Sequence, residues 1–199
     1  MDHDQKIRYA EKVFNDVGME ITLGASYPAR QSPLAVRIMA ILLQDRLISR
    51  LSFRDVNQIC TNAAITRFNY NNGSHAICLI SLLLILKTVN HSLYQRAMNL
   101  EYITEEIFAL FDISLNDLSS LKDNEYFYQA MKDVIAYFAK TPADFLDKEV
   151  LKSFDYQYLS QERDREGVRK ISFKEKVLPP LKSFKLSNTE ATRLGGHPK

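Results

Sequence analysis

His75, His91, Cys60 and Cys78 are the first side chains to consider for nucleophilic, acid–base or metal chemistry in this chain. The two histidines are 16 positions apart. In one shared helix they would lie more than about four turns apart, so they cannot form one site together. Both cysteines have apolar neighbours, which favours packing in a core over activation as nucleophiles. A lone disulfide is also unlikely in this setting, so we predict two buried thiols.

Motifs for the common enzyme and cofactor classes are missing from the sequence. There is no Cys/His spacing of a zinc site, no glycine-rich phosphate loop and no Gly-x-Ser-x-Gly elbow. The carboxylate pairs Glu105–Glu106 and Asp144–Asp147 fit the first turns of helices, where the helix dipole favours acids. We therefore expect a non-enzymatic protein, with no catalytic residue, no cofactor and no metal site.

Aromatic residues point more clearly to a function. The chain has ten tyrosines and 11 phenylalanines, many of them in its C-terminal half. Tyrosine is common at protein interfaces because its ring buries area while its hydroxyl keeps a hydrogen-bond partner. We predict that Tyr128, Tyr156 and Tyr158 lie at a partner-binding surface.

Charge is distributed unevenly along the chain. Residues 160–199 carry ten Lys or Arg against five Asp or Glu, whereas the preceding residues carry 16 against 19. An acidic body with a basic C-terminal arm would bind an acidic surface, either on this body or on another protein. Acids interleaved with the bases fit solvated ion pairs better than a track for phosphate. The predicted partner-binding residues of the arm are Arg163, Arg165, Arg169, Lys170, Lys174 and Lys176.

One stretch of the chain leaves a DNA-binding alternative open. Phe53–Cys60 would form a first helix and Thr61–Asn62 the turn of a helix-turn-helix. A second helix would present Thr66, Arg67 and Asn69 to the bases. However, no glycine occupies the turn, and the net acidity of the body opposes docking on phosphate. Nucleic acid is therefore not the expected partner.

The most apolar stretch is SHAICLISLLLILKTVN, residues 74–90. Within Ala76–Leu86, a run of 11 residues, only Ser81 is polar. Such a run makes about 16 Å of helix, whereas a membrane-spanning helix needs about 20 apolar residues. A helix that is apolar on all sides is typical of the centre of a domain. We predict that role, with Ser74 as the cap and the helix continuing to about Met98; a strip left open for a partner is the alternative.

Helix-start signals and apolar spacing predict the remaining elements. The start signals are Ser32–Pro33, Ser52 with Asp55, Ser74, Thr104, Ser114 and Thr141–Pro142. Gly18 fits the C-terminal cap of the first helix. The predicted helices cover residues 3–17, 34–51, 53–64, 74–98, 105–111, 115–121, 124–140 and 143–154.

These elements predict a mainly α fold, a single compact helical domain of seven or eight helices. Six glycines and six prolines are few for a β-sandwich or small barrel. Residues 19–23 alternate in polarity and leave a short extended segment open. We predict a helical domain at 1–159 and a basic, mixed-charge arm at 160–199, in which 167–178 would form a strand or a short helix. Too polar for its own core, the arm would wrap the body, become ordered on a partner or stay mobile.

The size, the capped helices, the mixed-charge arm and a composition rich in Asn, Lys, Ile and Tyr give the chain an overall resemblance to a known family. It resembles the adaptor subunits of the bacterial type IVB secretion coupling complex. Segments such as SPLAVRIMAILLQDRL and GSHAICLISLLLILK have no residue-by-residue match, so no functional residue is carried across. The resemblance implies partner subunits and secreted effector proteins as ligands, at an inner-membrane machine but without membrane insertion.

The sequence therefore predicts a non-enzymatic protein-binding adaptor or chaperone-like subunit of a bacterial assembly. The N-terminus has no apolar core of signal-peptide length, which indicates a cytoplasmic location. Two alternatives remain at this point, a helix-turn-helix DNA-binding regulator and a secreted bacterial effector with an unidentified activity.

Overall fold

A computed structural model of the chain describes residues 3–22, 31–66, 76–146, 148–153 and 165–181. Within these ranges the chain forms ten α-helices and no strand, which confirms the predicted mainly α fold. The α-helices are α1 His3–Asp16, α2 Pro33–Leu42, α3 Asp45–Arg50, α4 Phe53–Thr66, α5 Ile77–Val89, α6 His91–Met98, α7 Thr104–Leu110, α8 Glu125–Phe138, α9 Lys148–Ser153 and α10 Arg165–Ser172. The other elements are the 3₁₀ segments η2 Leu115–Asp123 and η3 Pro142–Asp144 and the π-helical segment η5 Phe173–Val177.

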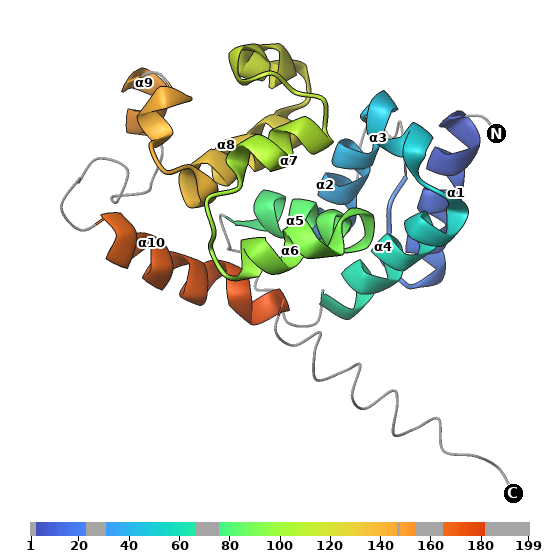
Figure 1. The fold of residues 1–199 in the computed structure, drawn as a ribbon. Coiled ribbons are helices and arrows are strands. Elements are labelled where there is room, and N and C mark those ends of the chain that lie inside the picture. The colour runs from blue at the N-terminus through green and yellow to red at the C-terminus, as the bar shows by residue number, and fades with distance from the viewer. Residues whose placement is uncertain (1–2, 23–30, 67–75, 147, 154–164, 182–199) are drawn as a thin grey trace, which may run out of the picture.

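Helix α5 lies in the middle of the molecule, with α1 and α4 at one end and α9 at the other (Figure 1). Every side chain from Ile77 to Leu86 is buried, because α2, α4, α6 and α8 pack around α5. The hydroxyl of Ser81 donates to the carbonyl of Ile77 at 2.8 Å, so this buried polar group is satisfied within its own helix. The central role predicted for the apolar stretch is confirmed. Its predicted cap, Ser74, lies outside the described residues.

Across the described ranges, no helix has both the length and the apolar character needed to cross a membrane. Helix α5 is 13 residues long, and Lys87 falls in its last turn. The apolar stretch Ala76–Leu86 is therefore part of the hydrophobic core.

Three local signals read from the sequence are confirmed. The hydroxyl of Ser32 accepts from the amide of Ala35 at 3.4 Å and caps α2. Before α4, the carboxylate of Asp55 accepts from the amide of Ser52 at 2.8 Å, and the Ser52 hydroxyl accepts from the amide of Asp55 at 3.2 Å. This is a reciprocal capping box. Gly18 ends α1 with φ 72°, a left-handed conformation that glycine adopts without a clash at Cβ.

Two of the predicted helices are each divided in two. Gln44 is extended, with φ −65° and ψ 113°, so α2 ends at Leu42 and α3 begins at Asp45. Asn90 also leaves the helical conformation, with φ −148° and ψ 87°. Its side chain accepts from the amide of Leu93 at 3.0 Å, so the same residue ends α5 and caps α6. The predicted single helix is therefore wrong at both positions.

Three further predicted helix starts differ from those in the structure in their capping residue, helix type or position. Helix α7 begins at Thr104 with Ile103 in the cap position, so Thr104 is not the cap. Residues 115–123 form a 3₁₀ segment where an α-helix was predicted. Thr141–Pro142 begin the single 3₁₀ turn η3, and α9 starts only at Lys148.

The chain after α1 alternates in burial without forming a strand in the described residues. Met19 and Ile21 are buried, whereas Glu20 and Thr22 are exposed. The side chain of Asn15 donates to the carbonyl of Ile21 at 2.9 Å and accepts from its amide at 3.1 Å. Because the side chain of Asn15 already accepts from the amide of Ile21, that amide is not available to a sheet partner.

Helix α4 runs without interruption from Phe53 to Thr66. The turn predicted at Thr61–Asn62 is absent, because Thr66 is buried and its hydroxyl donates to the carbonyl of Asn62 at 2.9 Å. The helix-turn-helix interpretation of this stretch is therefore wrong. Arg67 and Asn69, which would have faced the bases, lie outside the described residues.

The first part of the basic arm packs on the helical body. Residues 165–181 continue helically through α10 and η5, so of the two predicted shapes the helix is correct. The buried face carries three apolar side chains spaced four residues apart: Phe173, Val177 and Leu181. The ring of Phe173 lies 5.5 Å from that of Tyr137 and 5.9 Å from that of Phe138, centroid to centroid. These side chains belong to the same core as α5 and α8. The predicted boundary at residue 160 falls within 154–164, outside the described residues.

Candidate functional site: a cleft beside helix α7

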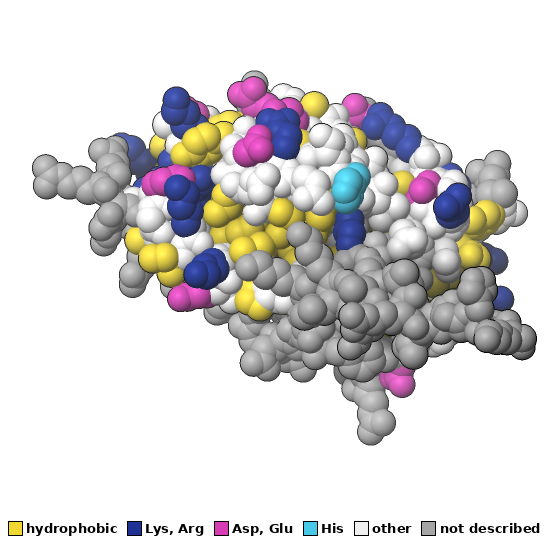
Figure 2. Space-filling view, turned by 60° about the horizontal axis from the view of Figure 1, so that its bottom comes forward, with side chains coloured by type: hydrophobic (Ala, Val, Ile, Leu, Met, Phe, Trp, Pro, Cys, Tyr) yellow, Lys and Arg dark blue, Asp and Glu magenta, His cyan; other side chains and the backbone are white. Residues whose placement is uncertain are grey.

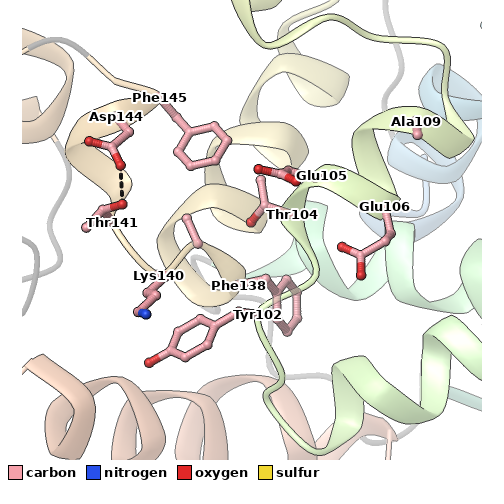
Figure 3. A pocket seen from close by; sticks show the side chains of 11 residues that line it. Tyr102, Thr104, Glu105, Glu106, Ala109, Phe138, Lys140, Thr141, Asp144 and Phe145 are labelled. Atoms are coloured by element: carbon pink, nitrogen blue, oxygen red, sulfur yellow. Dashed lines mark hydrogen bonds between the residues drawn. The ribbon is translucent and has the colours of Figure 1, made fainter.

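A hollow with a polar rim lies between α7 and η3 and is called the α7–η3 cleft below (Figure 3). Its volume of about 770 Å³ falls in the range of ligand sites. The lining residues are Tyr102, Thr104, Glu105, Glu106, Ala109, Phe138, Ala139, Lys140, Thr141, Asp144 and Phe145. A second hollow of about 510 Å³, the α6–α7 hollow, shares Glu106 and Ala109 with it, so α7 is the ridge between the two.

Backbone hydrogen bonds set the two walls of the α7–η3 cleft. The amide of Ile103 donates to the carbonyl of Phe138 at 3.2 Å, which ties the start of α7 to the end of α8. Beyond Phe138 the chain becomes extended at Ala139 and turns into η3. The hydroxyl of Thr141 donates to the carboxylate of Asp144 and closes the η3 turn. The wall facing α7 is thus a short, internally bonded turn.

Leu100 turns the chain from α6 toward the cleft. Its φ of 56° is left-handed, a conformation that costs a residue with a branched side chain about 1 kcal/mol. The amide of Glu101 donates to the carbonyl of Arg96 at 3.1 Å and completes the end of α6. The carbonyl of Leu100 accepts from Arg169 at 3.2 Å, so α10 holds this strained residue in place.

Tyr102 is the aromatic residue at the rim of the cleft, and it is fixed although 47 % of its surface is exposed. Its hydroxyl donates to Glu166 at 2.9 Å, and the guanidinium of Arg169 lies 4.7 Å from the centre of its ring. Hydrogen bonds from Arg169, then from Tyr102 and Lys170, lower the pKa of Glu166 to about 2. Helix α10 therefore anchors one wall of the cleft.

Arg165 and Arg169 were predicted to bind a partner, and the structure uses both within the chain. Arg169 is only 1 % exposed and donates to the carbonyl of Tyr137 at 2.5 Å. Arg165 donates to the carbonyls of Ala139 and Lys140, which both line the cleft. The two guanidiniums donate to backbone carbonyls at and just after the end of α8, which have no partner within the helix. They thereby fix the cleft wall that follows α8.

The remaining predicted partner-binding residues have varied surroundings. The side chains of Lys170, Lys174 and Lys176 are exposed on α10 and η5. Tyr128 is half-buried, with the ammonium of Lys132 lying 5.0 Å from the centre of its ring. Three others lie outside the described residues: Tyr156, Tyr158 and Arg163.

Ion pairs brace α7 from the side of α6. Arg96 donates to Glu101 at 2.8 Å and to Glu106 at 2.9 Å, and these two hydrogen bonds raise the pKa of Arg96. Glu106 is therefore neutralised by a neighbour. Arg50, which lines the α6–α7 hollow, pairs with Asp112 at 2.5 Å. Both arginines that line this hollow, Arg50 and Arg96, therefore have carboxylate partners.

Charge alternates over the face of the molecule in Figure 2. Hydrophobic side chains gather near the middle of this face, and cationic and anionic side chains are interspersed around them. No single-sign track for phosphate is visible on the described part of this face. The large apolar side chains that the described residues expose are Leu43, Tyr102 and Ile171, of which Tyr102 lines the α7–η3 cleft.

Three of the chemically versatile residues singled out in the sequence, Cys60, Cys78 and His91, do not line the cleft. Burial raises the pKa of Cys60 to about 12. Burial, and then the charge of Asp133, raise that of Cys78 to about 11, so both thiols stay protonated in the core. His91 is exposed and lies 3.2 Å from Gln95 between side-chain nitrogens, whereas His75 is outside the described residues.

Asp133 is a buried carboxylate that the sequence analysis missed. It is fully buried on α8, accepts from Gln129 at 2.9 Å and lies near Cys78. Asp133 is on α8, which packs against α5 and α2.

The cleft combines aromatic and methyl surface with a carboxylate rim. Phe138 and Ala139 are buried, Phe145 is half-buried, and Glu105 and Asp144 are exposed. Within the described residues, no group of three or more His, Cys, Asp or Glu is arranged to hold a metal ion. Such a surface can bind an amphipathic segment. Comparison with known protein families, with curated proteins and with solved structures gives no match.

Proposed function

We propose that this protein is a non-enzymatic adaptor that binds a segment of a partner protein in the α7–η3 cleft. The observation that carries the proposal is the mixed lining of the cleft, with aromatic surface at its base and carboxylates at its rim. Apolar contact supplies the attraction, and the charged rim selects the partner and its orientation.

The openness of the cleft favours a protein segment over a small molecule. Most of its lining side chains are exposed, among them Tyr102, Glu105, Lys140 and Asp144. Small-molecule sites bury most of their ligand, about 70–90 % of its surface. An open cleft suits an occupant that brings further surface of its own to cover the rim.

The rigidity of the walls also supports docking. Tyr102 is held by Glu166 and Arg169, and α7 is braced by Arg96. A surface that is already ordered loses little conformational entropy when a partner binds. The resemblance to adaptor subunits of the type IVB secretion coupling complex implies neighbouring subunits and secreted effectors as partners. Binding would take place in the cytoplasm.

The test is the formation of a defined complex. The tagged chain is purified from the cell that encodes it, and each stoichiometric companion is identified, expressed separately and mixed with the purified chain. We expect one companion to co-elute in size-exclusion chromatography. We also expect Glu105→Lys to abolish co-elution, because it reverses charge at the rim of the cleft.

The matched control is Glu175→Lys, the same change at an exposed residue of η5 outside the cleft lining. Point variants are cleaner than removal of the arm, since a deletion from residue 160 onward would take Phe173 out of the core. A chain that yields no companion able to re-form the complex would contradict the proposed function.

A further inference from the structure

The charges around the α7–η3 cleft define the chemistry of its occupant. Of the four charged side chains that the described residues place in its lining, three are carboxylates and one is Lys140. Glu106 is already paired with Arg96. Glu105 and Asp144 have no ion-pair partner in the part of the chain that the structure describes. An occupant with positive charge would complement them.

An aromatic ring, that of Phe145, lies close to this pair of carboxylates in the cleft lining. In the view of Figure 3, the ring of Phe145 lies between Asp144, on the η3 wall, and Glu105, on the α7 wall. An aromatic face attracts a cation through its quadrupole, and the attraction is strongest where the site is partly desolvated. A half-buried ring flanked by two carboxylates is therefore a receptor for an ammonium or guanidinium group.

The base of the cleft extends the match beyond the charge. The buried residues Phe138 and Ala139 line the cleft, and Ala109 adds an exposed methyl group on α7. Lys and Arg side chains have long methylene stems that pack on apolar surface while their charged ends stay near solvent. A lysine or arginine within a polypeptide would use both the base and the rim, whereas an inorganic cation would use only the rim.

Thr104 is an independent sign of a missing partner. It is 3 % exposed, and its hydroxyl has no hydrogen-bond partner in the described residues. Figure 3 shows its side chain on the cleft side of α7. Buried hydroxyls are normally hydrogen-bonded, and an unpaired one is costly. A backbone amide or carbonyl of an extended segment in the cleft would satisfy it.

We infer that the α7–η3 cleft binds a basic, extended segment of the partner protein. A Lys or Arg side chain of that segment lies over the ring of Phe145, between the carboxylates of Glu105 and Asp144. The backbone of the segment hydrogen-bonds to Thr104. The inference rests on the proposed function, because it names the partner chemistry for the same cleft. Membrane headgroups and nucleic acids are disfavoured, since their phosphates would be repelled by the rim.

The test uses a displayed library of random heptapeptides, selected on the full-length protein. We expect the selected peptides to be enriched in Lys or Arg flanked by apolar residues. The most enriched peptide is then synthesised with a fluorescent label and measured by anisotropy. The double variant Glu105→Gln/Asp144→Asn should weaken its binding about 2- to 30-fold, the loss of two solvent-exposed ion pairs.

Matched changes keep this result interpretable. The control double variant Glu175→Gln/Asp123→Asn removes the same charges at exposed positions outside the cleft and should leave affinity unchanged. Thr104→Val preserves the shape of the side chain and removes the hydroxyl, and it should weaken the peptide several-fold. Circular dichroism of each variant shows whether the fold is intact.

Three outcomes would overturn the inference: a library that yields no Lys or Arg enrichment, an unaffected double variant, or arginine amide alone binding as tightly as the peptide. The third outcome would make the cleft a site for small cations. If the complex with the companion protein still forms with Glu105→Gln/Asp144→Asn, the inference of a basic segment is rejected and the proposed adaptor function is not. Absence of any companion complex would reject the function itself.

Discussion

At the scale of single residues, Glu166 is the side chain that joins the C-terminal helix to the cleft. It accepts from Tyr102 at 2.9 Å and from Arg169 at 2.9 Å and 3.1 Å. A carboxylate with several donors is stabilised in its charged form, so its pKa falls from 4.5 to about 2. The position of Tyr102 therefore depends on the charge of Glu166.

This pairing predicts a pH dependence of stability. The pKa of Glu166 is lower in the folded than in the unfolded chain, so the stabilisation is fully present above about pH 4.5 and is lost as the pH falls toward 2. In urea unfolding followed by circular dichroism, the free energy of unfolding should fall more steeply over this range for the native chain than for Glu166→Gln. The carboxylates common to both chains cancel in the comparison, and parallel curves would contradict the predicted role of Glu166.

The charge pattern of the arm did not reveal these individual roles. Counting basic residues predicted an arm that binds an acidic surface on this body or on another protein, and Arg165 and Arg169 were counted with the lysines as partner-binding residues. The structure separates them because an arginine can donate several hydrogen bonds to backbone carbonyls at once. Sequence gives the type of charge at a position, but the neighbours that use it come from tertiary packing.

At the scale of elements, α10 and η5 form a helix with a polar outer face and an apolar inner face. The inner face is recognisable in the sequence as the four-residue spacing of Phe173, Val177 and Leu181. Pro179 and Pro180 obscured the pattern, because prolines are normally helix-breaking. The chain accommodates them with the π-helical turn just before, in which the amide of Leu178 donates to the carbonyl of Phe173.

The docking of this element predicts a large effect of Phe173→Ala. The ring is buried against Tyr137 and Phe138, so truncation should lower the free energy of unfolding by about 3–5 kcal/mol in urea denaturation. Lys174→Ala changes the adjacent exposed residue and should stay within about 0.5 kcal/mol. Equal small effects would mean that α10 lies outside the cooperative unit.

Element ends illustrate where sequence reasoning stops. Capping hydroxyls located the starts of α2 and α4 because their hydrogen bonds are local. The division at Asn90 was missed, since apolar periodicity continues from Leu86 to Leu93 across it. The cleft was missed for a similar reason: its walls are brought together by α7 packing on α8, a contact between separate segments.

At the scale of the whole molecule, α5 is the element on which the other helices converge. Helices α2, α4, α6 and α8 all contact it, and its buried run contains no charged residue. Length and composition alone predicted this position, because an apolar run too short for a membrane must be covered by protein. The helices that cover it could be predicted individually, but their arrangement could not.

The central position predicts an order of hydrogen exchange. Amides of α5 should exchange slowest, because their exposure requires global unfolding, whereas those of the short α9 should exchange by local opening. Hydrogen–deuterium exchange with mass spectrometry should therefore show the highest protection in peptides spanning Ile77–Val89. Greater protection of α9 would contradict this view of the core.

The contribution of the last described helix to the core has a consequence for synthesis. Phe173 follows Phe138 by 35 positions. At a translation rate of about 5–20 residues per second, the nascent chain waits roughly 2–7 s between making the surface of α8 and making the helix that covers it. During that interval Tyr137 and Phe138 lack the ring of Phe173, which leaves the faces that it covers exposed. Pauses in translation after residue 138 would lengthen this exposure and lower the yield of folded protein.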